Sequence, residues 1–277
     1  MAPNRRTPPH RGRPSTGRPS RPPARQRRAE AEERSAEEQR YDGPEIPADV
    51  TARELDPRVR RQLRTLPDKL AERVARHLVA AGRLLEEDPE AAYQHTLAAR
   101  ARAARLAVVR EACGEAAYAA GRWAEAHAEF RAVRRMTGSG DYLPALADCE
   151  RALGRPARAL ELARDPAVGR LDDAGQAEML IVAAGARRDL GQPEAAVLAL
   201  AEPARRARAR TPTAARLRYA YADALLVCGH AGEALEWFHR AAASDLDGST
   251  DAVSRAAALE GLQLRDLTDE DGAPTAD

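Results

Sequence analysis

Regularly spaced turns are the feature that most limits how this 277-residue chain can fold. Glycine marks four of them, at positions 121, 154, 191 and 229, and Glu87 stands at the equivalent place upstream. Successive turns are 34, 33, 37 and 38 residues apart. A period of roughly 20 to 50 residues indicates one repeated supersecondary unit, since a single unit cannot bury its apolar face alone. The spacing therefore predicts stacked helical hairpins, one for each turn.

Small residues flank each turn at fixed distances. Those seven residues before the turn are Ala80, Gly114, Ala147, Ala184 and Ala222, and those five residues after it are Ala92, Ala126, Ala159, Ala196 and Ala234. Small residues on two antiparallel helices let the backbones approach closely. Nine residues after the turn stand Thr96, Phe130, Ala163, Leu200 and Phe238, which include both phenylalanines of the chain. We expect the larger side chains here to fill the space between one hairpin and the next.

Helix starts are expected where a capping side chain precedes proline, because proline at the first helical position loses no hydrogen bond. Asp56-Pro57, Asp88-Pro89 and Thr211-Pro212 fit this pattern, whereas Asp165-Pro166 indicates a turn. From about Val50 the chain is rich in Ala, Leu, Arg and Glu at helical spacing, with almost no β-branched runs. The pattern predicts an all-α fold.

The repeat resembles the tetratricopeptide repeat (TPR) family, whose 34-residue helix-turn-helix unit has small residues at repeat positions 8 and 20 and an aromatic at 24. The match is strongest over residues 107–140 and 215–248 and covers about 73–248. The resemblance implies a TPR-like solenoid of about five repeats. Pro166 and Pro203 replace the family's usual alanine, so their second helices are expected to be short or broken. Residues 52–66 are expected to form a capping helix.

Three regions follow from the composition. Residues 1–47 are Arg/Pro-rich and then Glu-rich, without enough apolar surface to offset the entropy lost on ordering, so we expect a disordered tail. Residues 48–264 are expected to form the TPR-like body. Residues 265–277 are expected to form a disordered acidic tail. The abundance of arginine over lysine is expected from a GC-rich genome.

No pattern of residues indicates catalysis or a bound cofactor. The three cysteines, Cys113, Cys149 and Cys228, are too few and too widely spaced for a disulfide framework or a zinc site. The histidines show no metal-ligand spacing, and no serine lies in a nucleophile elbow. No apolar run approaches the roughly 18 to 20 residues that cross a membrane. We therefore expect a cytoplasmic, non-enzymatic protein without metal, cofactor, membrane contact or small-molecule substrate.

The groove side chains implied by the resemblance suggest the first candidate function. TPR proteins bind extended peptides along their first helices, and the groove candidates here are Glu111, Glu115, Tyr118, Asp148, Tyr219 and Asp223. The predicted groove is acidic, so a basic peptide or another protein with a basic segment is the expected partner. The alternative is that these carboxylates are solvated or paired with arginines such as Arg151 and Arg188. The resulting hypothesis is a protein–protein adaptor.

The second candidate function is an RNA- or ribosome-associated protein. Its candidates are the nine arginines of residues 1–28, a stretch that contains no carboxylate: Arg5, Arg6, Arg11, Arg13, Arg18, Arg21, Arg25, Arg27 and Arg28. Further arginines cluster near the ends of second helices: Arg100, Arg102 and Arg105; Arg131, Arg134 and Arg135; Arg205, Arg206, Arg208 and Arg210. Those clusters either are solvated and complement the helix ends, or form a ridge for phosphates.

Overall fold

The computed structural model describes residues 43–207 and 210–261. Within these ranges the chain forms helices and turns and no β-strand, which confirms the all-α prediction for the described residues. Apart from residues 43–47, the two tails predicted to be disordered lie outside the described residues.

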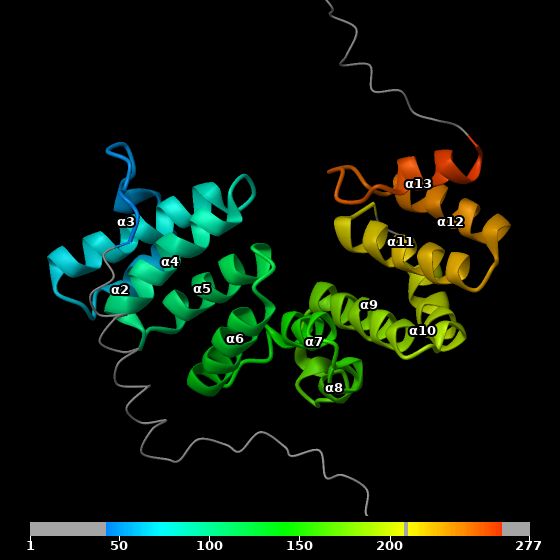
Figure 1. Ribbon diagram of the computed structural model, residues 1–277, viewed down its shortest axis with the longest axis horizontal. Coiled ribbons are helices and arrows are strands. Elements are labelled where there is room, and N and C mark those ends of the chain that lie inside the picture. Colours follow the sequence, from blue (N-terminus) through cyan, green and yellow to red (C-terminus); the bar gives the residue numbers. More distant parts are fainter. Residues whose placement is uncertain (1–42, 208–209, 262–277) are drawn as a thin grey trace, which may run out of the picture. The chain divides into compact units, whose positions relative to one another are not determined.

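Two 3-10 helices and twelve α-helices make up the described ranges (Figure 1). In chain order they are η1 (Ala52–Glu54), α2 (Pro57–Leu63), α3 (Asp68–Leu84), α4 (Pro89–Ala103), α5 (Ala107–Ala119), α6 (Trp123–Thr137), α7 (Leu143–Ala152), α8 (Pro156–Leu162), η2 (Val168–Arg170), α9 (Asp173–Asp189), α10 (Pro193–Arg206), α11 (Pro212–Val227), α12 (Ala231–Ala242) and α13 (Ala252–Leu259).

The predicted capping residues begin their helices. The Asp56 carboxylate accepts a hydrogen bond from the Arg58 amide at 2.6 Å, and Asp88 accepts one from Ala91 at 3.0 Å. The Thr211 hydroxyl oxygen accepts one from the Ala214 amide at 3.2 Å. Each bond satisfies an amide that has no partner within the helix, which confirms all three predicted starts.

The four turn glycines end the first helix of a hairpin in the same way. Gly121, Gly154, Gly191 and Gly229 have φ between 68° and 83°, the left-handed region that disfavours residues with a Cβ. In the first of these turns the Arg122 amide donates to the Ala117 carbonyl at 2.8 Å, and the Gly121 amide donates to Tyr118 at 3.0 Å. The other three turns repeat both bonds, which is the Schellman arrangement of a helix C-terminus. The glycine spacing therefore locates real turns.

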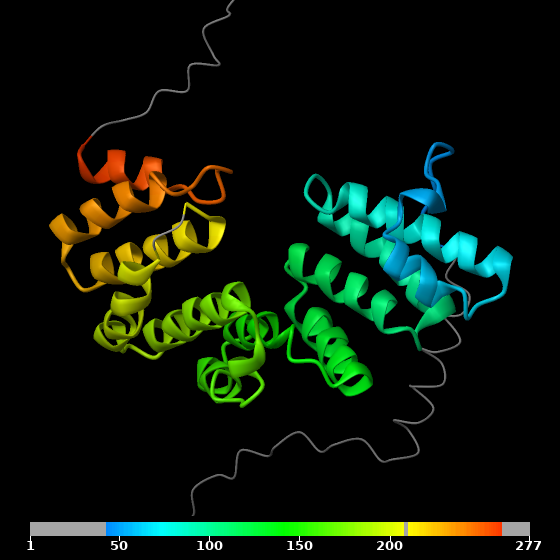
Figure 2. The same ribbon diagram turned by 180° about the vertical axis from the view of Figure 1, so that it is seen from behind.

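Each hairpin packs its two helices together and then packs on the next hairpin. The pairs are α3 with α4, α5 with α6, α7 with α8, α9 with α10 and α11 with α12. Contacts also join α4 to α5, α6 to α7, α8 to α9, α10 to α11 and α12 to α13, so neighbours in sequence are neighbours in space (Figures 1 and 2). The predicted capping helix at residues 52–66 is η1 followed by α2, and both pack on α3.

The repeat positions with small and large residues meet in the core. A Cβ added to Gly114 would lie 2.6 Å from the Phe130 ring, so only glycine leaves room for that ring within the hairpin. Phe130 is buried and stacks on Tyr142 of the next hairpin, with ring centroids 4.6 Å apart. Phe238 is likewise buried and meets Tyr219 edge-on, with ring centroids 5.3 Å apart. The Arg255 guanidinium of α13 lies over the Phe238 ring, 5.1 Å from its centroid. Both phenylalanines thus connect their own hairpin to the following helix, as predicted.

The two prolines predicted to shorten second helices behave differently. The helix before Pro166, α8, has only seven residues, and the Asp165 carboxylate accepts the Ala167 amide at 2.9 Å in the turn that follows. The prediction was wrong for Pro203, because α10 continues through it to Arg206. Pro203 lies in the last turn of α10, where its missing N–H removes one bond and its own carbonyl still accepts the Ala207 amide at 3.0 Å.

Candidate functional site

The six predicted groove residues lie on first helices, in two groups. Glu111, Glu115 and Tyr118 are on α5, and Asp148 is on α7. Tyr118 donates a hydrogen bond to Asp148 at 2.5 Å, which brings these two helices together on one side of the hairpins. Tyr219 and Asp223 on α11 form the second group. We call the side of α5, α7, α9, α11 and α13 that carries these residues the first-helix face.

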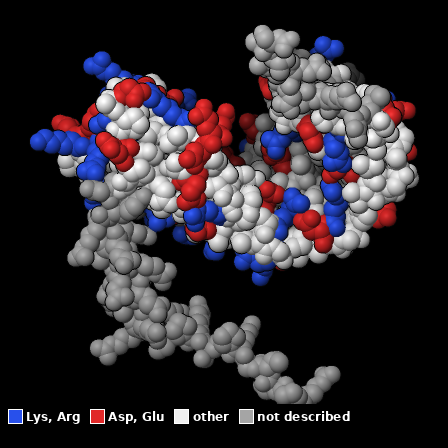
Figure 3. All heavy atoms as spheres, turned by 45° about the horizontal axis from the view of Figure 1, so that its top comes forward, with Lys and Arg blue, Asp and Glu red and all other residues white. Residues whose placement is uncertain are grey.

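Ion pairs between successive first helices occupy much of this face. Arg151 of α7 contacts Asp148 at 2.9 Å and Asp189 of α9 at 2.8 Å. Arg188 of α9 pairs with Asp223 of α11, which also accepts Arg255 of α13 at 2.9 Å. Asp148 and Asp223 are therefore neutralised by arginines, as the alternative interpretation expected. Figure 3 shows red and blue side chains intermixed in the hollow over the C-terminal helices.

A glycine on α9 makes room for one of these arginines. A Cβ added to Gly185 would lie 2.4 Å from the central guanidinium carbon of Arg151. Gly185 occupies the repeat position equivalent to Glu115, Asp148 and Asp223, where three of the other four hairpins carry an acidic side chain. The missing side chain lets Arg151 lie across α9 and reach Asp189.

The N-terminal end of the first-helix face differs from the rest, because its carboxylates have no cationic partner among the residues that the structure describes. Glu111, Glu115 and Asp141 form no ion pair within the part of the chain that the structure describes. Burial, and then the negative charges of Glu115 and Asp141, raise the pKa of Glu111. Tyr142 donates a hydrogen bond to Glu115 at 2.6 Å. We call Glu111, Glu115 and Asp141 the acidic end; a mainly red strip over the N-terminal helices in Figure 3 has the same sign.

An apolar pocket adjoins the acidic end. Its volume is about 260 Å³, and Glu111 and Glu115 stand among its lining residues. The remaining walls come from α2, α3, α4, α5 and the residues that follow η1 and α3, and the larger apolar side chains are Leu55, Val59, Leu78, Leu85 and Val108. The sequence predicted the two glutamates but neither Asp141 nor the pocket, because the pocket depends on how α2, α3, α4 and α5 come together, and Asp141 lies in the turn before α7.

Tyr219 has a structural environment. Its ring packs against Phe238, and burial raises the pKa of its hydroxyl to about 12, with a further contribution from a hydrogen bond to Asp251. Burial also raises the pKa of the Tyr118 hydroxyl, which bonds to Asp148. Both tyrosines therefore remain protonated near neutral pH and serve as hydrogen-bond donors.

Several histidines and cysteines are buried or engaged in contacts within the protein. His77 and His95 are buried and share a hydrogen bond between their Nδ1 atoms at 3.0 Å, while His127 lies 2.8 Å from Glu150. Burial raises the pKa of the Cys113 thiol to about 11 and that of Cys149 to about 12, so neither forms a thiolate near neutral pH. Among the residues that the structure describes, no group of His, Cys, Asp and Glu could hold a metal ion.

The arginine clusters on second helices do not form one solvated set. Arg100 is mostly buried. The buried Glu129 carboxylate pairs with Arg100 at 2.5 Å and with Arg110 at 2.8 Å. The expectation that Arg100 is solvated was therefore wrong, because it pairs with a buried carboxylate. Arg134 pairs with Asp165 at 2.5 Å, whereas Arg131 and Arg135 are exposed. Arg208 and the nine tail arginines proposed for RNA binding lie outside the described residues.

Comparison with known proteins gives no family for this chain. In the ranges that the structure covers, no helix has the length and apolar character needed to cross a membrane. No model of a known protein family matches the sequence, and no curated protein matches it either.

Proposed function

We propose that this chain is a TPR-like adaptor that binds a basic segment of another protein at the acidic end of its first-helix face. The observation that carries the proposal is the position of Glu111 and Glu115, which line an apolar pocket and, like the nearby Asp141, have no cationic partner among the described residues. On this proposal the protein works by binding, without catalysis or a cofactor.

The TPR-like assignment is supported by the five-fold recurrence of turns at a spacing near 34 residues. The Schellman turns and the contact between Gly114 and Phe130 support it further, since they give the spacing a physical basis. The side of the first helices is also where the TPR family binds extended peptides, so the resemblance and the unpaired carboxylates favour the same surface.

A basic ligand follows from the electrostatics of the acidic end. The Glu111 carboxylate is partly desolvated and faces two other negative charges, which is why its pKa is raised. An arginine or lysine placed there would supply the missing counter-charge. The neighbouring pocket of about 260 Å³ would take an aliphatic side chain, or the stem of the cation itself. The preferred segment therefore combines a cation with an apolar residue.

The rest of the first-helix face serves as support in this proposal. Asp148 already pairs with Arg151 of its own helix, and Asp223 pairs with arginines of α9 and α13, so both carboxylates offer little net charge to a ligand. The pairs that cross between helices are Arg151 with Asp189 and Asp223 with both Arg188 and Arg255; they join α7, α9, α11 and α13 and help to fix the spacing of the hairpins. Binding specificity then resides at the N-terminal end of the face.

The experiment titrates a basic synthetic peptide, residues 1–28 of this chain, into the full-length protein by isothermal calorimetry. The test variant is Glu111→Gln with Glu115→Gln. The matched control is Glu86→Gln with Glu87→Gln, which changes the net charge equally at an exposed turn. The proposal expects binding that weakens with salt and falls by about tenfold or more in the test variant only. Equal affinities for the two variants, or no binding at low salt, would overturn it.

A further inference from the structure

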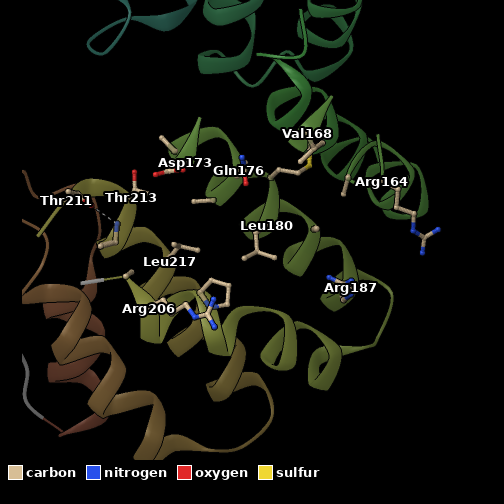
Figure 4. Close-up of a pocket in the computed structure, with 18 of the residues that line it drawn as sticks. Arg164, Val168, Asp173, Gln176, Leu180, Arg187, Arg206, Thr211, Thr213 and Leu217 are labelled. Atoms are coloured by element: carbon tan, nitrogen blue, oxygen red, sulfur yellow. Dashed lines mark hydrogen bonds between the residues drawn. The ribbon is translucent and has the colours of Figure 1, made fainter. Parts of the chain in front are cut away.

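A second surface of the protein is a large groove over α9, which we call the α9 groove. Its volume is about 1120 Å³, and its walls come from α8, η2, α10 and the start of α11. It uses a different side of α9 from the first-helix face: Gln176, Leu180 and Arg187 line the groove, while Arg188 pairs with Asp223 on the first-helix face. Figure 4 shows the lining side chains from these helices around the open space.

The short helix α8 accounts for the groove. It has seven residues, against 15 in α6 and 14 in α10, and the Asp165-Pro166 turn ends its course over α9. The opening therefore extends along α9 from Asp173 to Arg187. At a rise of 1.5 Å per residue, this stretch is roughly 21 Å long, which is about four helical turns.

The chemistry of the groove combines an aliphatic floor with cationic edges. Leu160, Val168, Leu180 and Leu217 supply apolar surface together with several alanines, and the lining contains no aromatic side chain. Arg164, Arg187 and Arg206 stand around it, as Figure 4 shows, against the single carboxylate of Asp173.

The side chains of two edge arginines have no partner in the described residues. The guanidiniums of Arg164 and Arg187 form no ion pair or hydrogen bond there, and Arg164 is exposed. Arg206 contacts Glu202 at 2.5 Å, but its side chain is 81% exposed, and such a pair adds little stability. The edge therefore carries positive charge that the described residues do not neutralise.

The cationic character continues on the other side of α8. Arg164 also borders a hollow of about 800 Å³ between α6 and α8. Arg131 and Arg135 line that hollow, are exposed and have no ion pair among the described residues. A ligand in the α9 groove would thus meet favourable potential beyond the groove as well.

We propose that the α9 groove binds an amphipathic helix of a partner protein, with apolar residues on one stripe and Asp or Glu beside it. The aliphatic floor fits side chains at i, i+3 or i+4, and i+7 of a helix, and the arginines complement the flanking acids. Phosphates and bases would leave the aliphatic floor unused and find no aromatic ring for stacking, which disfavours a nucleic acid. The protein would then hold a basic segment at the acidic end and an acidic helix here.

The test selects ligands from a display library of random 16-residue peptides, using the full-length protein. One groove variant is Arg164→Glu with Arg187→Glu. A second is Ala174→Glu, which places a negative charge in the groove at an exposed helical position. The matched control is Arg60→Glu with Arg61→Glu, exposed arginines on α2. All variants keep the arginine-rich tail, so binding by the tail does not separate them. Circular dichroism checks that each is folded.

The expected result is enrichment of peptides that combine Leu, Ile or Met at helical spacing with Asp or Glu. Enriched peptides should bind both groove variants at least about tenfold more weakly than the wild type and the control. The proposal is overturned if no peptides are enriched, if the enriched set is basic, or if the groove variants bind like the control. A labelled 20-nucleotide RNA that loses affinity in the same two variants would assign the surface to nucleic acid instead, and would also overturn it.

Discussion

The buried carboxylate of Glu129 provides the sharpest test of how the hairpins are held together. It lies on α6 and bonds to Arg100 of α4 at 2.5 Å and to Arg110 of α5 at 2.8 Å. Its side chain is 4% exposed, and those of Arg100 and Arg110 are 17% and 27% exposed. Replacing Glu129 by Gln removes the charge that both guanidiniums share, with almost no change in volume.

Breaking a buried ion pair by removing one partner costs about 3 to 5 kcal/mol. We expect the lower end, about 3 kcal/mol, because the flexible arginine stems let both guanidiniums move toward water. For a folded unit of this size, that loss corresponds to a fall in Tm of roughly 6 to 12 °C.

Urea denaturation followed by circular dichroism at 222 nm measures the loss as a difference in free energy of unfolding. Glu233→Gln is the control, since Glu233 is exposed and has no ion pair in the described residues. If Glu129→Gln lowers the free energy of unfolding by less than about 1 kcal/mol, the range of exposed pairs, the stabilising role of the buried pairs of Glu129 with Arg100 and Arg110 is refuted. A variant with Arg100→Met, Arg110→Met and Glu129→Leu should recover most of the stability, because no buried charge is left unpaired.

Three further predictions concern the turns, the seams and the histidine pair. Gly154→Ala should lower the free energy of unfolding by about 1 to 2 kcal/mol, because the φ of Gly154 is 73°. Gly82→Ala should raise it by about 0.5 to 1 kcal/mol, because Gly82 lies inside α3 with open space around it. Urea denaturation measures both changes. Phe130→Ala and Phe238→Ala should each cost about 3 to 5 kcal/mol, and near-zero losses in the same assay would contradict the seam assignment. Burial lowers the pKa of His95, so the unfolded chain binds a proton at this residue more readily than the folded chain does. The free energy of unfolding should therefore fall as pH drops below about 6.5. Thermal unfolding at pH 7.5 and 5.0 should show a smaller fall in Tm for His95→Gln than for the wild type.

The sequence predicted the features that depend on local chemistry. A side-chain cap before proline and a glycine with positive φ satisfy or permit nearby backbone groups, so Asp88-Pro89 and Gly121 could be assigned from their neighbours alone. The recurrence of these signals then located every hairpin. Pro203 was misjudged because the effect of a proline depends on how far it lies from the helix end.

The features that the sequence did not predict depend on contacts between distant residues. Gly185 leaves space for Arg151, which lies 34 positions earlier, and nothing in the spacing of either residue announces the pair. The burial of Glu129 likewise depends on arginines from two other helices. A short α8 was expected, but the α9 groove that it leaves open requires the positions of α9, α10 and α11.

Zero-length cross-linking tests the central claim, that basic ligands bind at the acidic end. The probe is the peptide of residues 1–28 with its arginines replaced by lysines, coupled to carboxylates by carbodiimide and mapped by mass spectrometry. Lys69 is the chain's only lysine, so almost all amide cross-links would come from the probe. The account predicts that Glu111, Glu115 and Asp141 carry most of them, and that salt suppresses the reaction. Cross-links spread evenly over exposed acids such as Glu86 and Glu233, or absent from all three acidic-end residues, would contradict it.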